Sequence, residues 1–155
     1  NTGAAGWRPG GNFGMLTGTS TNSLYVYDGA WEKPKLPGTN SGAATSGIAW
    51  RADGSRALIV GRATGNPLSG TVIELRPSGD EFLASDLIHQ GIPGFDKAPW
   101  HATFSTHLWD ADWRPASACH EGLIVGTDNG SGLSPTFGLV IRFYDVDNPS
   151  CSPGG

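Results

Sequence analysis

The densest group of chemically reactive side chains lies in the segment WHATFSTHLWDADW, residues 100–113. Its two histidines and two aspartates are His101, His107, Asp110 and Asp112. Side chains of these types ligate metal ions or transfer protons. The histidines are six residues apart, however, and this spacing matches none of the strong zinc-binding signatures. We therefore expect no metal site in this segment.

The predicted strand through this segment also separates the ligand types. In a regular strand, alternate side chains project to opposite faces. Ala111 would then face one way with His107 and Trp109, whereas Leu108 would face the other way with both aspartates. We expect one of these aspartates to accept hydrogen bonds from backbone N–H groups inside the fold, because buried polar groups need partners.

A second candidate is TDNGSG, residues 127–132, which offers oxygen ligands of the kind that Ca²⁺ prefers on Asp128, Asn129 and Ser131. The segment lacks the third acidic ligand and the final Glu of an EF-hand loop. Asn-Gly and Ser-Gly are strong turn formers, so a turn is the better interpretation.

Other catalytic and binding signatures are missing from the sequence. There is no Gly-x-Ser-x-Gly elbow and no Gly-rich phosphate-binding loop. The net charge is −4 and the ten Lys and Arg residues form no run, which argues against nucleic-acid binding and against attraction to an anionic membrane. No stretch approaches the roughly eighteen consecutive apolar residues of a membrane-spanning helix. We expect no catalytic residue, no cofactor and no bound metal.

The elements that must position these side chains are predicted to be strands. The 24 glycines and 11 prolines interrupt any helical pattern, and the apolar runs are short and rich in Val, Ile and aromatic residues. The fold class is therefore all-β. The clearest strands are expected at 23–29, 56–61, 70–75, 122–126 and 138–145.

Three segments, 5–19, 47–62 and 111–127, repeat one pattern. Each has a Trp-Arg pair, a turn, and an apolar run that ends in Gly. A polar loop and a further strand follow each of them, and the first two also have a fourth candidate strand, at 30–36 and 81–89. Each complete unit is thus predicted to be four antiparallel strands joined in sequence.

The motifs WRPGG, WRADG and WRPAS, each followed by strands that end in sequences such as YDG or FYD, resemble the WD40-like repeats of bacterial β-propellers. The resemblance covers nearly the whole chain, although the Gly-His and Trp-Asp dipeptides of the eukaryotic repeats are not at their usual places. It implies blades at about 3–38, 45–90 and 106–148, the last without its own outer strand, and a tail at 149–155.

Three blades do not close a propeller, which has about four to eight. Two apolar sheet faces would remain in water, and soluble proteins rarely expose such faces. We therefore expect a segment of a six- or seven-bladed wheel. Another polypeptide, a cleaved N-terminal part or a second copy of the chain would complete it.

The tryptophans that recur in the three units, Trp7, Trp50 and Trp113, are expected to pack between neighbouring sheets. The arginine that follows each of them would point the other way and pair with a carboxylate or a turn carbonyl. This is a structural interpretation of the Trp-Arg repeat.

The longest segments between predicted strands, 62–70, 90–106 and 127–137, would converge on one face of a propeller. Long loops on a rigid scaffold are common recognition sites, so this face is the candidate working surface. The alternative is that these loops only cover a neighbouring subunit. The candidate binding residues on this surface are Phe95, Trp100, His101, His107, Asp128 and Asn129.

The two cysteines, Cys119 and Cys151, would fall on the opposite rim. A disulfide between them would place the protein outside the cell, in the periplasm or in the cell envelope. The alternative is two free thiols in a cytosolic protein.

The favoured function is a non-enzymatic binding and assembly module that presents its long loops to a protein or polymer partner. The alternative is a metal-dependent hydrolase of the lactonase-like kind, completed by another chain or segment. Such an enzyme would need ligands at equivalent positions near the start of each blade's first strand. Gly6, Ala49 and Asp112 occupy those positions, and only Asp112 is a ligand.

Overall fold

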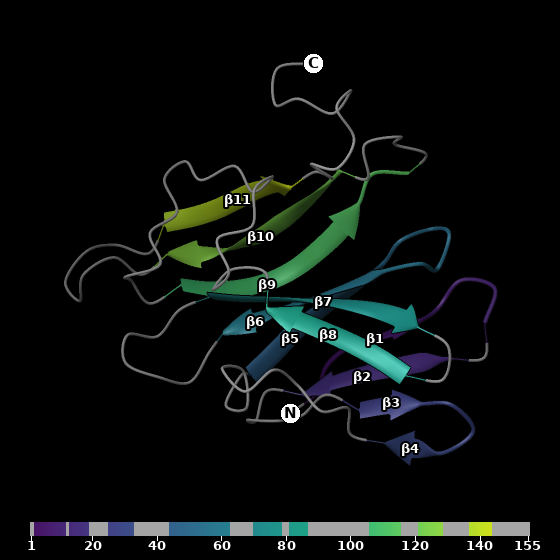
Figure 1. The fold of residues 1–155 in the computed structure, drawn as a ribbon. Coiled ribbons are helices and arrows are strands. Elements are labelled where there is room, and N and C mark those ends of the chain that lie inside the picture. Colours follow the sequence, from purple (N-terminus) through teal and green to yellow (C-terminus); the bar gives the residue numbers. More distant parts are fainter. Residues whose placement is uncertain are drawn as a thin grey trace.

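The computed structural model of the chain forms three antiparallel β-sheets (Figure 1). It describes residues 2–11, 13–18, 25–32, 44–62, 70–78, 81–86, 106–115, 121–128 and 137–143. These stretches contain strands and turns and no helix, so the prediction of an all-β chain is confirmed. Within them, no helix is present that could cross a membrane.

Each sheet is a meander in which strands that follow one another in the sequence are hydrogen-bonded neighbours. Sheet A consists of β1 (Thr2–Trp7), β2 (Gly14–Gly18), β3 (Tyr25–Tyr27) and β4 (Trp31–Glu32). Sheet B consists of β5 (Ala44–Trp50), β6 (Ala57–Arg62), β7 (Gly70–Ser78) and β8 (Glu81–Asp86). Sheet C consists of β9 (Thr106–Trp113), β10 (Gly122–Asp128) and β11 (Phe137–Phe143). The predicted strand order is thus confirmed in all three units.

The turn after the first strand is closed in the same way in each sheet. The backbone N–H of the arginine after the repeated tryptophan donates to the carbonyl of the residue before the second strand. These bonds join Arg8 to Phe13 at 2.8 Å, Arg51 to Arg56 at 2.9 Å and Arg114 to Glu121 at 2.8 Å. The Trp-Arg repeat in the sequence therefore marks the end of the first strand and the start of this turn.

A β-bulge recurs at the same place in the first strand of each sheet. The pairing shifts by one residue between Thr2 and Ala5 in β1 and between Thr45 and Gly47 in β5. In β9 the pairing shifts by one residue between Leu108 and Asp110, which pair with Gly126 and Val125 of β10. Counted back from the repeated tryptophan, the extra residue is the fourth in β5 and in β9, and in β1 it lies between the second and the fifth. The three sheets can therefore be compared residue by residue.

The bulge in β9 corrects the alternation predicted for this strand. Val125 pairs with Asp110 but the next residue, Gly126, pairs with Leu108, so Trp109 is the extra residue. Leu108 consequently lies in the same buried cluster as Ala111, not on the opposite face. A bulge changes which face the following side chains reach.

Sheet B is packed between the other two sheets, and strand β5 contacts both β1 and β9. The core between sheets A and B consists of Phe13, Met15, Val26, Ala57, Ile59, Ile73 and Leu75, with Ile48 and Trp50 packed against it. The core between sheets B and C consists of Ala49, Leu58, Val60, Val72, Leu108, Ala111, Trp113, Ile124, Ile141 and Phe143. Burial of both faces explains why the sequence of β6 is a continuous apolar run.

The first strands of neighbouring sheets approach each other at backbone distance. A Cβ atom at Gly47 of β5 would lie 2.8 Å from the Cα of Asp110 and 2.9 Å from the carbonyl oxygen of Trp109. A Cβ atom at Gly3 of β1 would lie 2.8 Å from the carbonyl oxygen of Thr45. Only glycine leaves room for such an approach.

The prediction for the repeated tryptophans is confirmed in two of three cases. Trp113 is buried between sheets B and C, and Trp50 packs against the core between sheets A and B. Trp7 is 66% exposed, because it lies on the face of sheet A that no other described sheet covers, so its packing against a further sheet stays a prediction.

The following arginines behave as predicted. Arg8 Nε donates to the carbonyl of Gly54 at 2.8 Å, which ties sheet A to a turn of sheet B. Arg51 pairs with the carboxylate of Asp53 at 2.9 Å, and Arg114 pairs with Glu121. These contacts support the structural interpretation of the Trp-Arg repeat.

Candidate functional site

Most of the predicted working surface lies outside the described residues. This applies to Phe95, Trp100, His101 and Asn129, and to most of the three long segments that carry them. Asp128 is the last residue of β10, where its backbone pairs with Thr106 and Phe137. Cys119 and Cys151 also lie outside the described stretches, so the disulfide remains a prediction.

His107, the remaining predicted binding residue, lies at the centre of a polar contact between sheets B and C. Its Nε2 is 2.9 Å from Ser46 Oγ on β5. Its ring stacks on the indole of Trp109, with centroids 3.8 Å apart and planes at 20°. The indole Nε1 of Trp109 donates in turn to Thr127 Oγ1 on β10 at 3.3 Å. Together with Arg62, these residues form what we call the rim cluster.

The surroundings of His107 favour the neutral form of its ring. Its partial burial lowers the pKa of the ring, and the nearby positive charge of Arg62 lowers this pKa further. A neutral imidazole next to a serine hydroxyl is the arrangement of a base and a nucleophile. In the described part of the chain, however, no carboxylate contacts His107, so the third member of a catalytic triad is missing. The contact joins β5 to β9.

The two aspartates of β9 are used by the backbone of their own strand. Asp110 Oδ1 accepts from the N–H of Ala111, and Asp112 Oδ1 accepts from the N–H of Trp113, both at 2.9 Å. They accept backbone hydrogen bonds as expected, but both residues are exposed rather than buried. Among the described residues, no three His, Cys, Asp or Glu side chains are grouped as metal ligands would be.

The expected place of the metal-ligand positions within the first strands is wrong. Gly6, Ala49 and Asp112 were predicted near the start of the first strands. Each is instead the second-to-last residue of its strand, one position before the repeated tryptophan. Gly6 and Ala49 lie in the packed junctions, where Gly6 leaves room for Trp50 and Ala49 accepts from Trp113.

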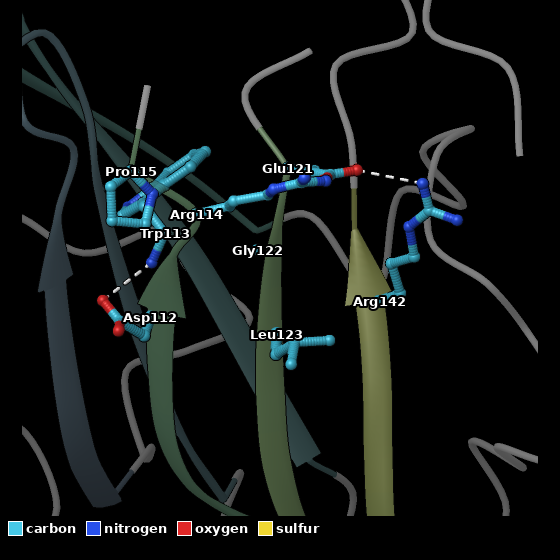
Figure 2. Close-up of a pocket in the computed structure, with 8 residues that line it drawn as sticks. All are labelled: Asp112, Trp113, Arg114, Pro115, Glu121, Gly122, Leu123 and Arg142. Carbon is cyan, nitrogen blue, oxygen red and sulfur yellow. Dashed lines mark hydrogen bonds and ion pairs between the residues drawn. The ribbon is translucent and has the colours of Figure 1, made fainter. Parts of the chain in front are cut away.

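A groove of about 320 Å³ opens on the face of sheet C that points away from sheet B (Figure 2). It is lined by Asp112, Trp113, Arg114, Pro115, Glu121, Gly122, Leu123 and Arg142. Glu121 Oε2 pairs with Arg142 Nη2 at 2.9 Å, and its other oxygen pairs with Arg114. Hydrogen bonds from Arg114 and then Arg142 lower the pKa of Glu121, although partial burial opposes them. The groove thus contains a fully paired carboxylate beside exposed apolar surface.

The ion pair in this groove has a counterpart of reversed sign in sheet B. Glu121 precedes β10 as Arg56 precedes β6. Arg142 lies opposite Leu123 as Glu74 lies opposite Leu58. Arg56 Nη1 and Glu74 Oε1 are 3.1 Å apart, and Glu74 is only 4% exposed because sheet C covers it. The charges of the groove therefore belong to the repeat and do not by themselves indicate a ligand.

The face of sheet C that points away from sheet B carries three exposed aliphatic residues, Leu123, Val125 and Val140. They are 51%, 42% and 61% exposed. Their counterparts in sheet B are identical in type and wholly covered by sheet C: Leu58 at 1%, Val60 at 0% and Val72 at 0%. We call this surface the C open face.

The uncovered face of sheet A is aromatic. Trp7 and Trp31 are 66% and 60% exposed, and Tyr27 lies between them with ring centroids at 6.1 Å and 5.1 Å. A second groove, of about 340 Å³, is lined by these rings together with Ala5, Gly6, Gly14, Met15 and Leu16. We call this surface the A open face. Sequence reasoning predicted two uncovered apolar faces but not their residues, which needed the pairing registers.

Comparison of the chain with protein-family models, with curated proteins and with solved structures found no match in any of the three. The function must therefore be argued from the geometry of the chain itself. The two open faces and the rim cluster are the features that a function has to explain.

Proposed function

We propose that this chain is a segment of a β-propeller and acts as a non-enzymatic binding and assembly module. One observation carries the proposal. The side chains on the two open faces occupy the positions that are buried in the junctions between sheets A and B and between sheets B and C. Radially repeated four-stranded meanders whose faces cover one another are the architecture of propellers.

The exposed aromatic and aliphatic residues support assembly. Contiguous apolar patches on soluble proteins mark interaction sites. The rings of Trp7, Tyr27 and Trp31 form such a patch on one side of the stack, and Val125 and Val140 are part of another on the opposite side. Further sheets of the same kind would bury both patches and give a wheel of six or seven blades.

The rim cluster supports the placement of the working surface. The long segments begin or end at Arg62 on β6, at Thr106 on β9 and at Asp128 on β10. Arg62 is close enough to His107 to act on its charge, and Thr106 pairs with Asp128, so these strand ends lie at one rim. Loops anchored there would be presented together to a protein or polymer partner.

In this proposal, the two cysteines indicate the cellular compartment in which the protein acts. A disulfide between Cys119 and Cys151 would place the module outside the cytoplasm. The mass of the intact protein before and after reduction tests this directly: a gain of about two daltons from two added hydrogens is expected. An unchanged mass would leave two free thiols and remove the argument for an oxidising compartment.

The structure of the native assembly tests the proposal as a whole. We expect the A open face and the C open face each to be covered by another antiparallel sheet, with β1, β5 and β9 around a common axis. A stable particle in which water contacts both faces would overturn the proposal. The identity of the chain that supplies the covering sheets does not affect this test.

A further inference from the structure

We propose that a second copy of this chain covers the open faces, in a head-to-tail dimer in which each C open face packs on the A open face of the other copy. This inference rests on the proposed propeller function. The open faces of one molecule correspond to the two sides of a junction that the same molecule already forms twice.

The junction between sheets B and C shows what each side contributes. Sheet B presents a flat aliphatic surface of Leu58, Val60 and Val72. Sheet C presents larger side chains against it, and among these Trp113 and Phe143 meet edge to face with ring centroids 4.8 Å apart. One side of the junction is thus aliphatic and the other is rich in aromatic rings.

The C open face repeats the aliphatic side of this junction. Leu123, Val125 and Val140 stand at the pairing positions of Leu58, Val60 and Val72 with no change of residue type. A surface that binds an aromatic face inside the molecule is therefore presented again at its edge.

The A open face repeats the aromatic side. Trp7 stands at the position of Trp113, and Tyr27 stands at the position of Phe143, because each ring pairs with Gly14 or its counterpart Gly122 in the second strand. Trp7 and Tyr27 also meet edge to face, at 87°. The A open face of one copy thus has the residues that fit the C open face of another.

One of the two junctions also has a polar contact at its rim, whereas in the other junction the counterpart arginine, Arg51, pairs with Asp53 in its own turn. Across the junction of sheets A and B, Arg8 donates to the carbonyl of Gly54 in the next turn. Arg114 stands at the position of Arg8, and its side chain is 70% exposed. In the dimer it faces the turn at 8–13 of the second copy, which is the counterpart of the turn that contains Gly54.

The residue before the repeated tryptophan differs in sheet C. Asp112 stands where the other sheets have Gly6 and Ala49, and Ala49 accepts from the indole N–H of Trp113 at 3.1 Å. Asp112 adds a carboxylate at this place, which is a hydrogen-bond acceptor for the indole N–H of Trp7 in the second copy. The departure is therefore compatible with the junction.

Ring closure determines the number of copies. A contact between two different faces is heterologous, and it generates a closed ring or an open filament. Two copies double the three sheets of the chain to six, within the range of about four to eight blades that propellers have. A third copy would exceed that range, so the closed form is a dimer.

Sedimentation of the purified chain tests the inference. The wild-type protein should have twice the chain mass of 16.1 kDa. Val140→Lys on the C open face and Trp7→Lys on the A open face should each sediment as single chains with unchanged circular dichroism. Ala52→Lys, in an exposed turn away from both faces, is the matched control and should leave the dimer intact.

A mixture of the two variants gives the sharper result. Each variant alone has no native junction, but a mixed pair keeps one, between the intact A open face of the Val140→Lys chain and the intact C open face of the Trp7→Lys chain. We therefore expect the mixture to restore a two-chain species. A symmetric dimer of two identical faces would instead be insensitive to one of the two variants.

Two outcomes would overturn the inference: a folded wild-type chain that stays single at the highest soluble concentration, or a dimer that survives both lysine variants. Neither outcome would overturn the proposed propeller, because a different polypeptide could still cover the faces. Conversely, a structure of the native dimer with both open faces in water would refute the proposed function as well.

Discussion

Leu58 and Leu123 offer the most direct test of the residue-by-residue equivalence of the sheets. They are the same residue type at the same position of β6 and β10, but Leu58 is 1% exposed and Leu123 is 51% exposed. The difference arises because sheet C covers the face of Leu58, whereas no described sheet covers the face of Leu123. Substitution of each by alanine therefore isolates the contribution of the covering sheet.

Leu58→Ala removes fully buried methyl and methylene groups and leaves a cavity between sheets B and C. Substitutions of this kind lower the free energy of unfolding by about 2–5 kcal/mol. For a chain of this length, such a loss lowers the Tm by roughly 4–20 °C. Leu123→Ala creates no closed cavity, and its side chain already contacts water, so the single chain should lose about 1 kcal/mol or less.

Urea titration of both variants, followed by tryptophan fluorescence, measures the two losses. The comparison is made at a protein concentration at which sedimentation shows the single chain. As the concentration rises, Leu123→Ala should become more costly, because the second copy then covers this face. Equal losses for both variants in the single chain would refute the packing of sheet C on Leu58.

Three further outcomes are expected. Gly47→Ala should lower the free energy of unfolding by about 1–3 kcal/mol, because its Cβ would collide with the backbone of β9, whereas Gly138→Ala, with no atom within 4 Å, should be neutral in the same titration. Folding lowers the pKa of His107 from 6.5, so its contribution to the free energy of unfolding is fully present above pH 6.5 and should be lost as the pH falls below that value. The Tm of His107→Gln should therefore fall less steeply with decreasing pH than the Tm of the wild type. An equally steep fall in both proteins would contradict the assignment. Trp113→Phe should keep the aromatic packing but lose the hydrogen bond from the indole N–H to the carbonyl of Ala49, at a cost of about 0.5–1.5 kcal/mol, and a loss near zero would show that this hydrogen bond contributes nothing.

The strand plan could be predicted from the sequence because its signals are local. The Trp-Arg pair, the turn and the apolar run ending in Gly recur within a few residues, and they correctly locate the first two strands of each sheet. The predicted strand at 81–89 begins where β8 begins, at Glu81. Chain order then fixes the meander, because short turns can join only neighbouring antiparallel strands.

The features that depend on contacts between sheets could not be predicted in this way. Ser46 and His107 are 61 residues apart, and no local pattern relates them. The bulge at Trp109 changes which face Leu108 reaches, and a strict alternation misses it. The exposure of Trp7 depends on the absence of a covering sheet on its side of the described stack. Its local sequence does not signal this, because an arginine follows it as one follows each of the other two tryptophans.

The two ion pairs of opposite sign have a consequence for how such a chain diverges. Arg56 pairs with Glu74 inside sheet B, and Glu121 pairs with Arg142 inside sheet C. Each pair is neutralised within its own sheet, where Arg76 also contacts Glu74 and Arg114 also contacts Glu121, so the order of acid and base can differ between repeats without a compensating change in the neighbouring sheet. Duplicated units of this kind can acquire separate sequences one at a time while the spacing between them stays the same.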